Sequence, residues 1–259
     1  SFTQFQGLPI TNIHIQQLSF GASVNDTNWV KKNFVTRFAD NLHLQTKARI
    51  IRNNLFFKEG DNVFPYLMAD NERHLREQLF LQDARIVLQP AKDGRSVEAF
   101  IITKDVFSLG GSIDISSSES GKLNIQEENF LGIGDKLEAS LLYDQSRLQK
   151  TGFGAAYNRR NIQGTFSDFT IGFQNYKSAF NSGRNEETVM YASISKPLVT
   201  PYFPFTYTIG FEQHQTKNQY IADSTYYQFF NYQYYLIDAW AAYNLDARGI
   251  INRNNPTDR

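Results

Sequence analysis

The chain has 259 residues, and its 26 Lys and Arg balance its 26 Asp and Glu to a formal net charge of +0. This balance leaves no basic excess for a phosphate backbone, which disfavours a nucleic-acid partner. The lack of cysteine excludes disulfides, thiol catalysis and thiolate metal sites. No apolar run is long enough for a spanning helix, and the opening SFTQFQGLPI lacks the features of a signal peptide.

The aromatic content is high for a chain of such low hydropathy. Phe, Tyr and Trp make up 15% of the residues, yet the mean hydropathy is -0.45. A transmembrane β-barrel has this composition because its lipid-facing and lumen-facing residues alternate and cancel. A soluble β-sandwich can have it too, so composition alone leaves both classes open.

The first 108 residues have mixed α/β patterning. The apolar periodicity predicts strand, helix, helix, strand and strand, in that order, over residues 10–20, 46–60, 65–79, 83–90 and 96–105. Thr46 suits the N-cap of the first helix, Gly60 its end, and Pro65 the first turn of the second. Leu79 is expected to face inward from the second helix.

The second predicted helix carries two acid–base pairs spaced four residues apart. They are Glu72 with Arg76, and Arg73 with Glu77. Such pairs stabilise a helix by a few tenths of a kcal/mol each. We interpret both as solvated surface pairs.

From Leu109 the pattern is all-β. Apolar and polar residues alternate within residues 136–145, 151–158, 167–175, 203–213 and 234–245. The polar face is rich in Gly and Thr with isolated charges, and the apolar face ends in Tyr or Phe near the strand termini. This pattern favours a membrane barrel with aromatic girdles over a sandwich.

The sequence offers no convincing site for covalent chemistry. No two histidines have metal-ligand spacing among His14, His43, His74 and His214. Gly132 and Gly134 predict a tight turn instead of a dinucleotide fingerprint. Asp135, Glu138 and Asp144 are interpreted as turn or lumen charges. We therefore predict no catalytic residue, no cofactor and no metal.

Three strings between residues 46 and 108 resemble one family. LFFKEGDNVFP links the predicted helices, NERHLREQLFLQDARIVLQP runs from the second helix into a strand, and VEAFIITKDVFSL leaves the last strand. They are similar to the polypeptide-transport-associated (POTRA) domain of the outer-membrane assembly-factor superfamily, the BamA/TamA-like surface antigens. Phe107 stands where the family commonly has Trp.

The following segments resemble the barrel of the same family. GGSIDISSSESG is similar to its first strand and outer turn, EENFLGIGDKLEASL to the next inner turn, and ISKPLVTPYFPFTYTIGFE to a later one. The resemblance implies an α+β POTRA domain (β-α-α-β-β) over residues 1–108, with an insertion after its first strand. It also implies that residues 109–259 are the N-terminal part of an all-β, antiparallel transmembrane barrel.

Length separates this chain from the family. At roughly 19 residues per strand and loop, the residues from 109 on allow about eight strands, whereas the family barrel has sixteen. An open sheet edge is costly in lipid. We expect the chain to be the N-terminal half of a longer protein, with a small closed barrel as the alternative.

The resemblance implies two functional strands. One is a POTRA edge on which unfolded strands dock by backbone hydrogen bonding, expected at Ala84, Arg85, Ile86, Val87 and Leu88. The other is the first barrel strand, one side of a seam that opens laterally, expected at Gly111, Ser112, Ile113, Asp114, Ile115, Ser116, Ser117 and Ser118. Ile86→Pro is expected to impair docking of a client strand, because proline removes a backbone N–H donor from the β-ladder, at a cost to the domain of a few kcal/mol.

The implied function is non-enzymatic assembly and insertion of outer-membrane proteins. The implied location is the outer membrane of a Gram-negative bacterium, with the N-terminal domain in the periplasm. Implied partners are outer-membrane lipids, unfolded outer-membrane or secreted polypeptides, and periplasmic or lipoprotein accessory subunits. Secretion of a polypeptide through the lumen is the first alternative, and a passive porin the second. A lipid-modifying barrel enzyme is disfavoured because no Ser, His and acid cluster can be assembled.

Overall fold

The computed structural model describes residues 1–18, 45–221, 231–245 and 247. The insertion expected before the first helix, within residues 19–44, lies outside the described residues. None of the helices in the described ranges is long and apolar enough to cross a membrane.

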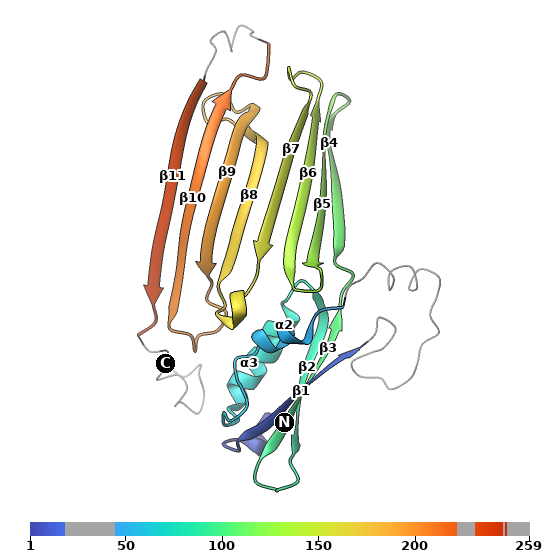
Figure 1. Cartoon of the computed structure of the whole chain (residues 1–259), viewed down its shortest axis with the longest axis vertical. Coiled ribbons are helices and arrows are strands. Elements are labelled where there is room, and N and C mark those ends of the chain that lie inside the picture. The colour runs from blue at the N-terminus through green and yellow to red at the C-terminus, as the bar shows by residue number, and fades with distance from the viewer. Residues whose placement is uncertain (19–44, 222–230, 246, 248–259) are drawn as a thin grey trace, which may run out of the picture.

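An α/β unit occupies the N-terminal end of the molecule (Figure 1). Its elements are η1 (Phe2–Phe5), β1 (Ile10–Leu18), α2 (Ala48–Asn53), α3 (Pro65–Arg76), β2 (Leu81–Pro90) and β3 (Val97–Asp105). The three strands form a sheet in the order β1-β3-β2, with β1 parallel and β2 antiparallel to β3. The predicted order of strand, helix, helix, strand and strand is therefore present.

The first helix is shorter than predicted, and its cap was wrong. Lys47, not Thr46, is the N-cap, and α2 ends at Asn53. The Thr46 N–H instead donates to Asp105 Oδ2 at 2.6 Å. Beyond the helix, the Phe56 N–H donates to the Asn71 side chain at 2.9 Å, so the chain leaves the helix to bond α3. Gly60, with φ +93, lies in the loop that follows.

Helix α3 starts at Pro65 as predicted but ends at Arg76. The Leu81 N–H bonds to the Gln78 carbonyl in a turn that leads into β2. Leu79 therefore lies beyond the helix and is 61% exposed, which corrects the prediction that it faces inward.

One hydrophobic core lies between the helices and the three-stranded sheet. The inward positions predicted for the last two strands are buried, namely Ile86, Leu88, Val97, Ala99 and Ile101. Met68 and Leu75 of α3 and Ile51 of α2 pack in the same cluster. Burial of this apolar surface holds the α/β unit together.

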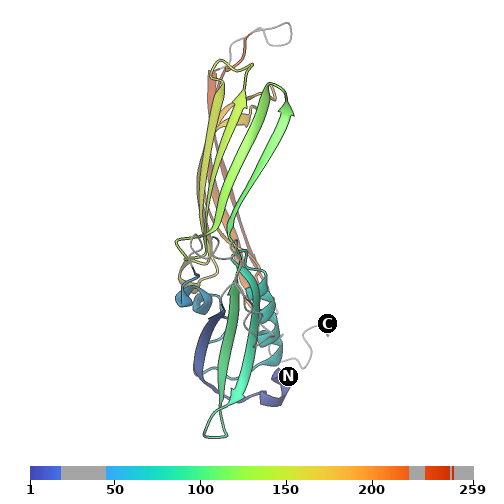
Figure 2. The same ribbon diagram turned by 90° about the vertical axis from the view of Figure 1, so that its right-hand side faces the viewer.

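The rest of the described chain forms one eight-stranded antiparallel sheet. Its strands are β4 (Leu109–Ser117), β5 (Ser120–Phe130), β6 (Asp135–Asp144), β7 (Thr151–Arg159), β8 (Asp168–Ser178), β9 (Asn185–Lys196), β10 (Phe205–Lys217) and β11 (Asn231–Tyr243). Neighbours in the chain are neighbours in the sheet, with β4 and β11 at its two edges. The sheet is curved (Figure 2) but β4 does not pair with β11 in the described ranges, so it is a partial barrel and not a small closed one.

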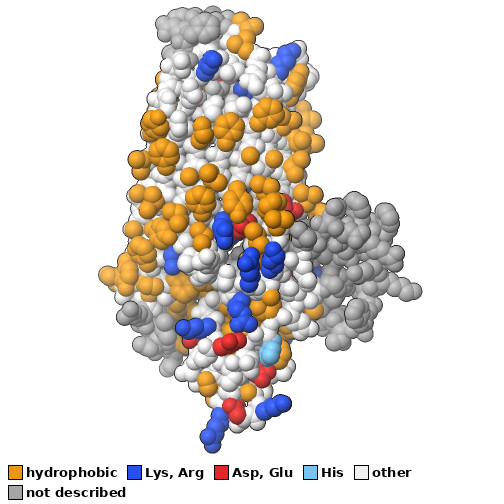
Figure 3. Space-filling view, in the orientation of Figure 1, with side chains coloured by type: hydrophobic (Ala, Val, Ile, Leu, Met, Phe, Trp, Pro, Cys, Tyr) orange, Lys and Arg blue, Asp and Glu red, His pale blue; other side chains and the backbone are white. Residues whose placement is uncertain are grey.

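The two faces of this sheet differ in chemistry. Large apolar side chains gather on the face of the sheet turned to the viewer in Figure 3. The exposed large apolar side chains of these strands include Phe153, Ile171, Ile209 and Phe211. On the opposite face, a Cβ added to Gly172 would meet the Tyr191 ring at 2.3 Å, so the glycine makes room for that ring. The alternation predicted from the sequence therefore separates an apolar outer face from a polar inner face.

Candidate functional site

Strand β2 is an edge strand of the three-stranded sheet, and it contains the predicted docking residues Ala84 to Leu88. Antiparallel pairing with β3 uses one side of β2, with Ile86 opposite Ile101. The Ile86 N–H points the other way, toward α3, where it donates to Glu72 Oε2 at 2.7 Å. Ile86→Pro would thus remove a donor from the free edge, and not from the β2–β3 ladder as expected.

The side chains of α3 and of the strand itself occupy this edge. Arg76 Nε donates to the Ala84 carbonyl at 2.9 Å, and the Ala84 N–H donates to Asp83 Oδ1 at 2.8 Å. Arg76 also bonds the Glu72 carboxylate. The Glu72–Arg76 pair therefore binds the sheet edge, which corrects its interpretation as a solvated surface pair.

The other acid–base pair of α3 stays on the surface as predicted. Arg73 Nη1 donates to Glu77 Oε1 at 2.7 Å, and Arg73 also contacts Asp70 Oδ1. Both Arg73 and Glu77 are more than half exposed. Two pairs of equal spacing on one helix thus have different partners.

A groove of about 270 Å³ runs beside the β2 edge. One wall is β2 from Arg85 to Leu88 with Glu72, and the other is the N-terminal segment that includes Phe2 and Phe5 of η1. The groove gives an extended segment room to approach the edge.

The predicted seam strand is β4, an edge strand of the large sheet. Within the described residues it pairs with β5 alone, with Ile113 opposite Leu123. Ile113 and Ile115 are 71% and 78% exposed. The strand ends at Ser117, and Ser118 lies in the turn that follows.

The α/β unit is joined to the base of the large sheet by buried polar contacts. Asn129, at the end of β5, donates to the Thr46 hydroxyl at 2.9 Å, and the Lys47 N–H donates to the Gly132 carbonyl at 2.8 Å. Gly134 has φ +73, and a Cβ there would lie 3.0 Å from the Phe80 ring and 3.1 Å from Ile50. The tight turn predicted from Gly132 and Gly134 thus lies directly against the α/β core.

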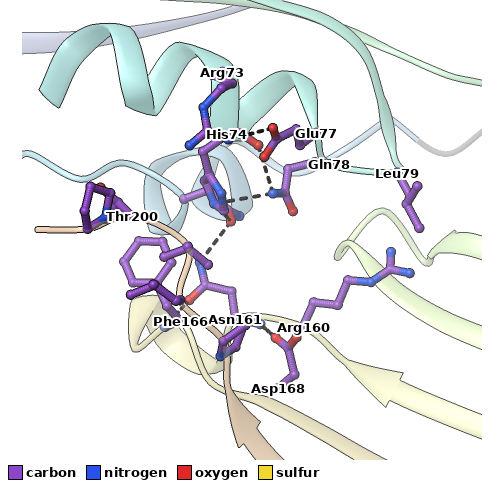
Figure 4. A pocket seen from close by; sticks show the side chains of 15 residues that line it. Arg73, His74, Glu77, Gln78, Leu79, Arg160, Asn161, Phe166, Asp168 and Thr200 are labelled. Carbon is purple, nitrogen blue, oxygen red and sulfur yellow. Dashed lines mark hydrogen bonds and ion pairs between the residues drawn. The ribbon is translucent and has the colours of Figure 1, made fainter. Parts of the chain in front are cut away.

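A cavity of about 470 Å³ lies at this junction (Figure 4). It is lined by the end of α3, the turn between β7 and β8, and residues 197–201. His74 of α3 faces Phe56 and Phe166 and lies 3.3 Å from Asn54 Oδ1. Burial lowers the pKa of His74 to about 4, so the ring is neutral at pH 7.

A buried polar cluster lies on the inner face at β9, β10 and β11, and sequence reasoning missed it. His214 lies between two carboxylates, with Nδ1 2.6 Å from Glu187 Oε1 and Nε2 2.8 Å from Glu212 Oε2. The Tyr234 hydroxyl donates to Glu187 at 3.1 Å, and Thr216 donates to it at 2.9 Å. The signal was the alternation of Glu212, His214 and Thr216 on the polar face of one strand.

The acidic residues singled out in the sequence, Asp135 and Asp144, form hydrogen bonds with different partners. Asp135 accepts a hydrogen bond from the Tyr157 hydroxyl, whereas Asp144 accepts one from Tyr220 at 2.9 Å. Among the described residues, no group of three or more His, Cys, Asp and Glu is arranged to hold a metal ion. His43 lies outside the described ranges.

No protein-family model and no curated protein matches the sequence. Among solved structures, the chain is similar to BamA from Haemophilus ducreyi lacking POTRA domains 1-3, with a TM-score of 0.48 and 14% identity over 90% of this chain and 44% of that one. It is also similar to CdiB from Acinetobacter baumannii, with a TM-score of 0.47 and 9% identity over 93% of this chain and 44% of that one. BamA belongs to the superfamily that the sequence strings resemble. The chain spans less than half the length of each structure.

Proposed function

We propose that this chain is part of an outer-membrane protein that assembles and inserts other β-rich polypeptides. Residues 1–108 would be a periplasmic POTRA domain, and the residues from 109 on the N-terminal part of the barrel. Support comes from the order of the sequence strings and of the elements they fall on. The apolar outer face of the large sheet supports contact with lipid, because so large an exposed apolar surface needs an apolar environment.

The observation that carries the proposal is the pair of strand edges at β2 and β4. Each is an outer strand of its sheet in the described residues. The outward N–H and C=O groups of an edge strand can pair with an extended chain of almost any sequence, as a client-independent factor requires. In this proposal β2 receives an unfolded strand, and β4 is one side of the seam through which strands enter the membrane.

Secretion through the lumen is the second candidate. It would be favoured by an inner face lined with Lys and Arg. Some described cations of the inner face are paired with carboxylates, as in Lys136 with Glu138 at 2.9 Å and Lys177 with Glu212 at 3.5 Å. Others have different partners, as Lys122 lies over the Tyr176 ring and Arg147 donates to the Asn175 carbonyl. Because Glu138 and Glu212 share the face with these cations, the lining does not carry one sign of charge, which supports insertion over electrostatic guidance of a polypeptide along the lumen.

Site-specific photo-cross-linking tests the proposal. A photoreactive residue is placed in the full chain, in detergent, at Arg85 on β2, at Ile113 on β4, at Ile171 on the outer face, or at Ser193 on the inner face. The probe is a urea-unfolded barrel protein diluted onto the chain. We expect cross-links from positions 85 and 113 and few from 171. Cross-links mainly from position 193 would contradict insertion and favour secretion.

A further inference from the structure

Three neighbouring backbone groups on the free edge of β2 are already bonded by side chains. The Ile86 N–H is held by Glu72, the Ala84 carbonyl by Arg76, and the Ala84 N–H by Asp83. Arg76 links the other two, since it bonds Glu72 and lies 3.3 Å from Asp83 Oδ1. We name Glu72, Arg76 and Asp83 the edge clasp.

The edge clasp makes the bonds that an added strand would make. In a parallel pair, one residue of the new strand donates to the carbonyl of residue i−1 and accepts from the N–H of residue i+1. Here Arg76 donates to the Ala84 carbonyl and Glu72 accepts from the Ile86 N–H, so the two side chains take the place of such a residue. An extended polypeptide therefore cannot pair with this part of β2 until these two side chains leave.

The opposite edge of the sheet is closed differently. At Ile13 of β1, Glu59 accepts from the N–H at 3.2 Å and Arg52 donates to the carbonyl at 3.1 Å. There, however, the strand start is also bonded by backbone, because the Ile10 N–H donates to Asp61 and the Ile10 carbonyl accepts from Gly60. The β1 edge is thus closed by a loop of the fold, whereas the described bonds on β2 at Ala84 and Ile86 come from side chains.

We propose that the edge clasp gates strand docking: it protects the β2 edge in the free protein and is displaced by an extended polypeptide. The inference rests on the proposed function, since it concerns the same docking edge. Side chains can leave without unfolding α3 or β2, and Arg76 is already 47% exposed. Glu72 is only 18% exposed, so its carboxylate leaves the Ile86 N–H when a carbonyl of the incoming strand takes its place, and the backbone bonds of that strand offset the cost of the exchange. The groove beside β2 leaves space for the incoming segment.

The test measures binding of a defined peptide to the full chain in detergent. The peptide is residues 205–217 of this chain, FTYTIGFEQHQTK, which alternates in polarity. The double substitution E72A/R76A removes the two members of the edge clasp that bond Ile86 and the Ala84 carbonyl. It should tighten binding about three- to five-fold, because the peptide no longer competes with these side chains. The matched control is R73A/E77A, which removes the equally spaced pair that does not bond β2 and should leave the affinity unchanged.

A second measurement uses the unsubstituted chain, in case the double variant does not fold. The Arg76 Nε–H resonance should shift when the peptide binds, because its bond to the Ala84 carbonyl is lost. An unshifted resonance on a chain with bound peptide would overturn the gate. Equal affinity of the unsubstituted chain and E72A/R76A would also overturn it, while leaving the docking edge intact. Failure of all variants to bind the peptide would contradict the docking edge itself, and the gate with it.

Discussion

At the scale of single residues, identical spacing does not give identical roles. Glu72–Arg76 and Arg73–Glu77 are indistinguishable as i,i+4 pairs in the sequence. The position of β2 along one side of α3 decides that the first pair bonds a strand edge while the second stays in solvent. His74, which lies between these residues in the sequence, is buried against Phe56 and Phe166.

His74 makes stability depend on pH. Its pKa of about 4 lies below the usual value of 6.5, so the unfolded chain binds the extra proton first as the pH falls. The contribution of neutral, buried His74 to the free energy of unfolding is therefore fully present above pH 6.5. It decreases as the pH falls from 6.5 to 4, by about 3 kcal/mol over the whole window. Chemical denaturation of the chain in detergent at pH 7 and pH 5 should show the loss. The variant H74Q should lose less over the same interval, and an equal loss in both chains would contradict a role of His74.

Gly134 is expected to be intolerant of a side chain. G134A meets both a positive φ and a Cβ approach of 3.0 Å to Phe80, so we expect a loss of about 2–3 kcal/mol. G94A is the matched control, because Gly94 has φ +63 but no atom within 4 Å of the added Cβ. Thermal unfolding of both variants separates backbone strain from the close approach. Equal losses would show that the contact with the α/β core is unimportant.

At the scale of elements, the edge strands are the parts on which the proposed function depends. The direction of each N–H along β2 determines what a proline does there. Proline is tolerated where the N–H faces away from the ladder and is disruptive where it faces the partner strand. Because the Ile86 N–H faces Glu72, alternation directs the Val87 N–H toward β3.

I86P should lose about 2–3 kcal/mol because the core loses part of the buried Ile86 side chain, while the β2–β3 ladder keeps its bonds. V87P should lose about 3 kcal/mol or more because it removes a donor from that ladder. I86P should still fail to bind the 205–217 peptide, because the edge donor is missing. Thermal unfolding and peptide binding measured on the same samples check both parts. Strong peptide binding by folded I86P would mean that the docking edge lies elsewhere.

The predicted elements were located better than their ends. Alternation identified the last two strands of the α/β unit, because one face of each is buried in the core. The end of α2 at Asn53 could not be predicted, since the chain after it bonds Asn71 of α3. Helix α3 ends at Arg76 before the turn in which the Leu81 N–H bonds the Gln78 carbonyl. The role of Thr46 could not be predicted either. Its residue type suits a helix N-cap, but its hydroxyl accepts a hydrogen bond from Asn129 of the large sheet.

At the scale of the whole molecule, two parts with different solvent requirements are joined end to end. The α/β unit has a core shielded from water, whereas the large sheet exposes apolar side chains on its outer face. The junction bonds of Thr46, Lys47 and Asn129 connect them.

Residues 1–108 alone should therefore fold in water. The buried cluster from Ile10 to Ile101 lies entirely within this segment, so a single cooperative thermal transition is expected without detergent. Circular dichroism and near-ultraviolet spectra of the isolated segment check this. A segment without fixed tertiary structure would show that the large sheet is needed to complete the unit, and would contradict the proposed domain boundary.

Hydrophobic periodicity in the sequence predicted the class of each part, because it is a local property that burial on one face imposes. It predicted the α/β order, about eight barrel-type strands and an apolar outer face. Only the tertiary structure decided which groups meet across the chain. Glu72 reaches Ile86, Asn129 reaches Thr46, and Glu187 reaches His214, through contacts between separate elements. No local pattern encodes such a contact, since it depends on how the elements are placed in space.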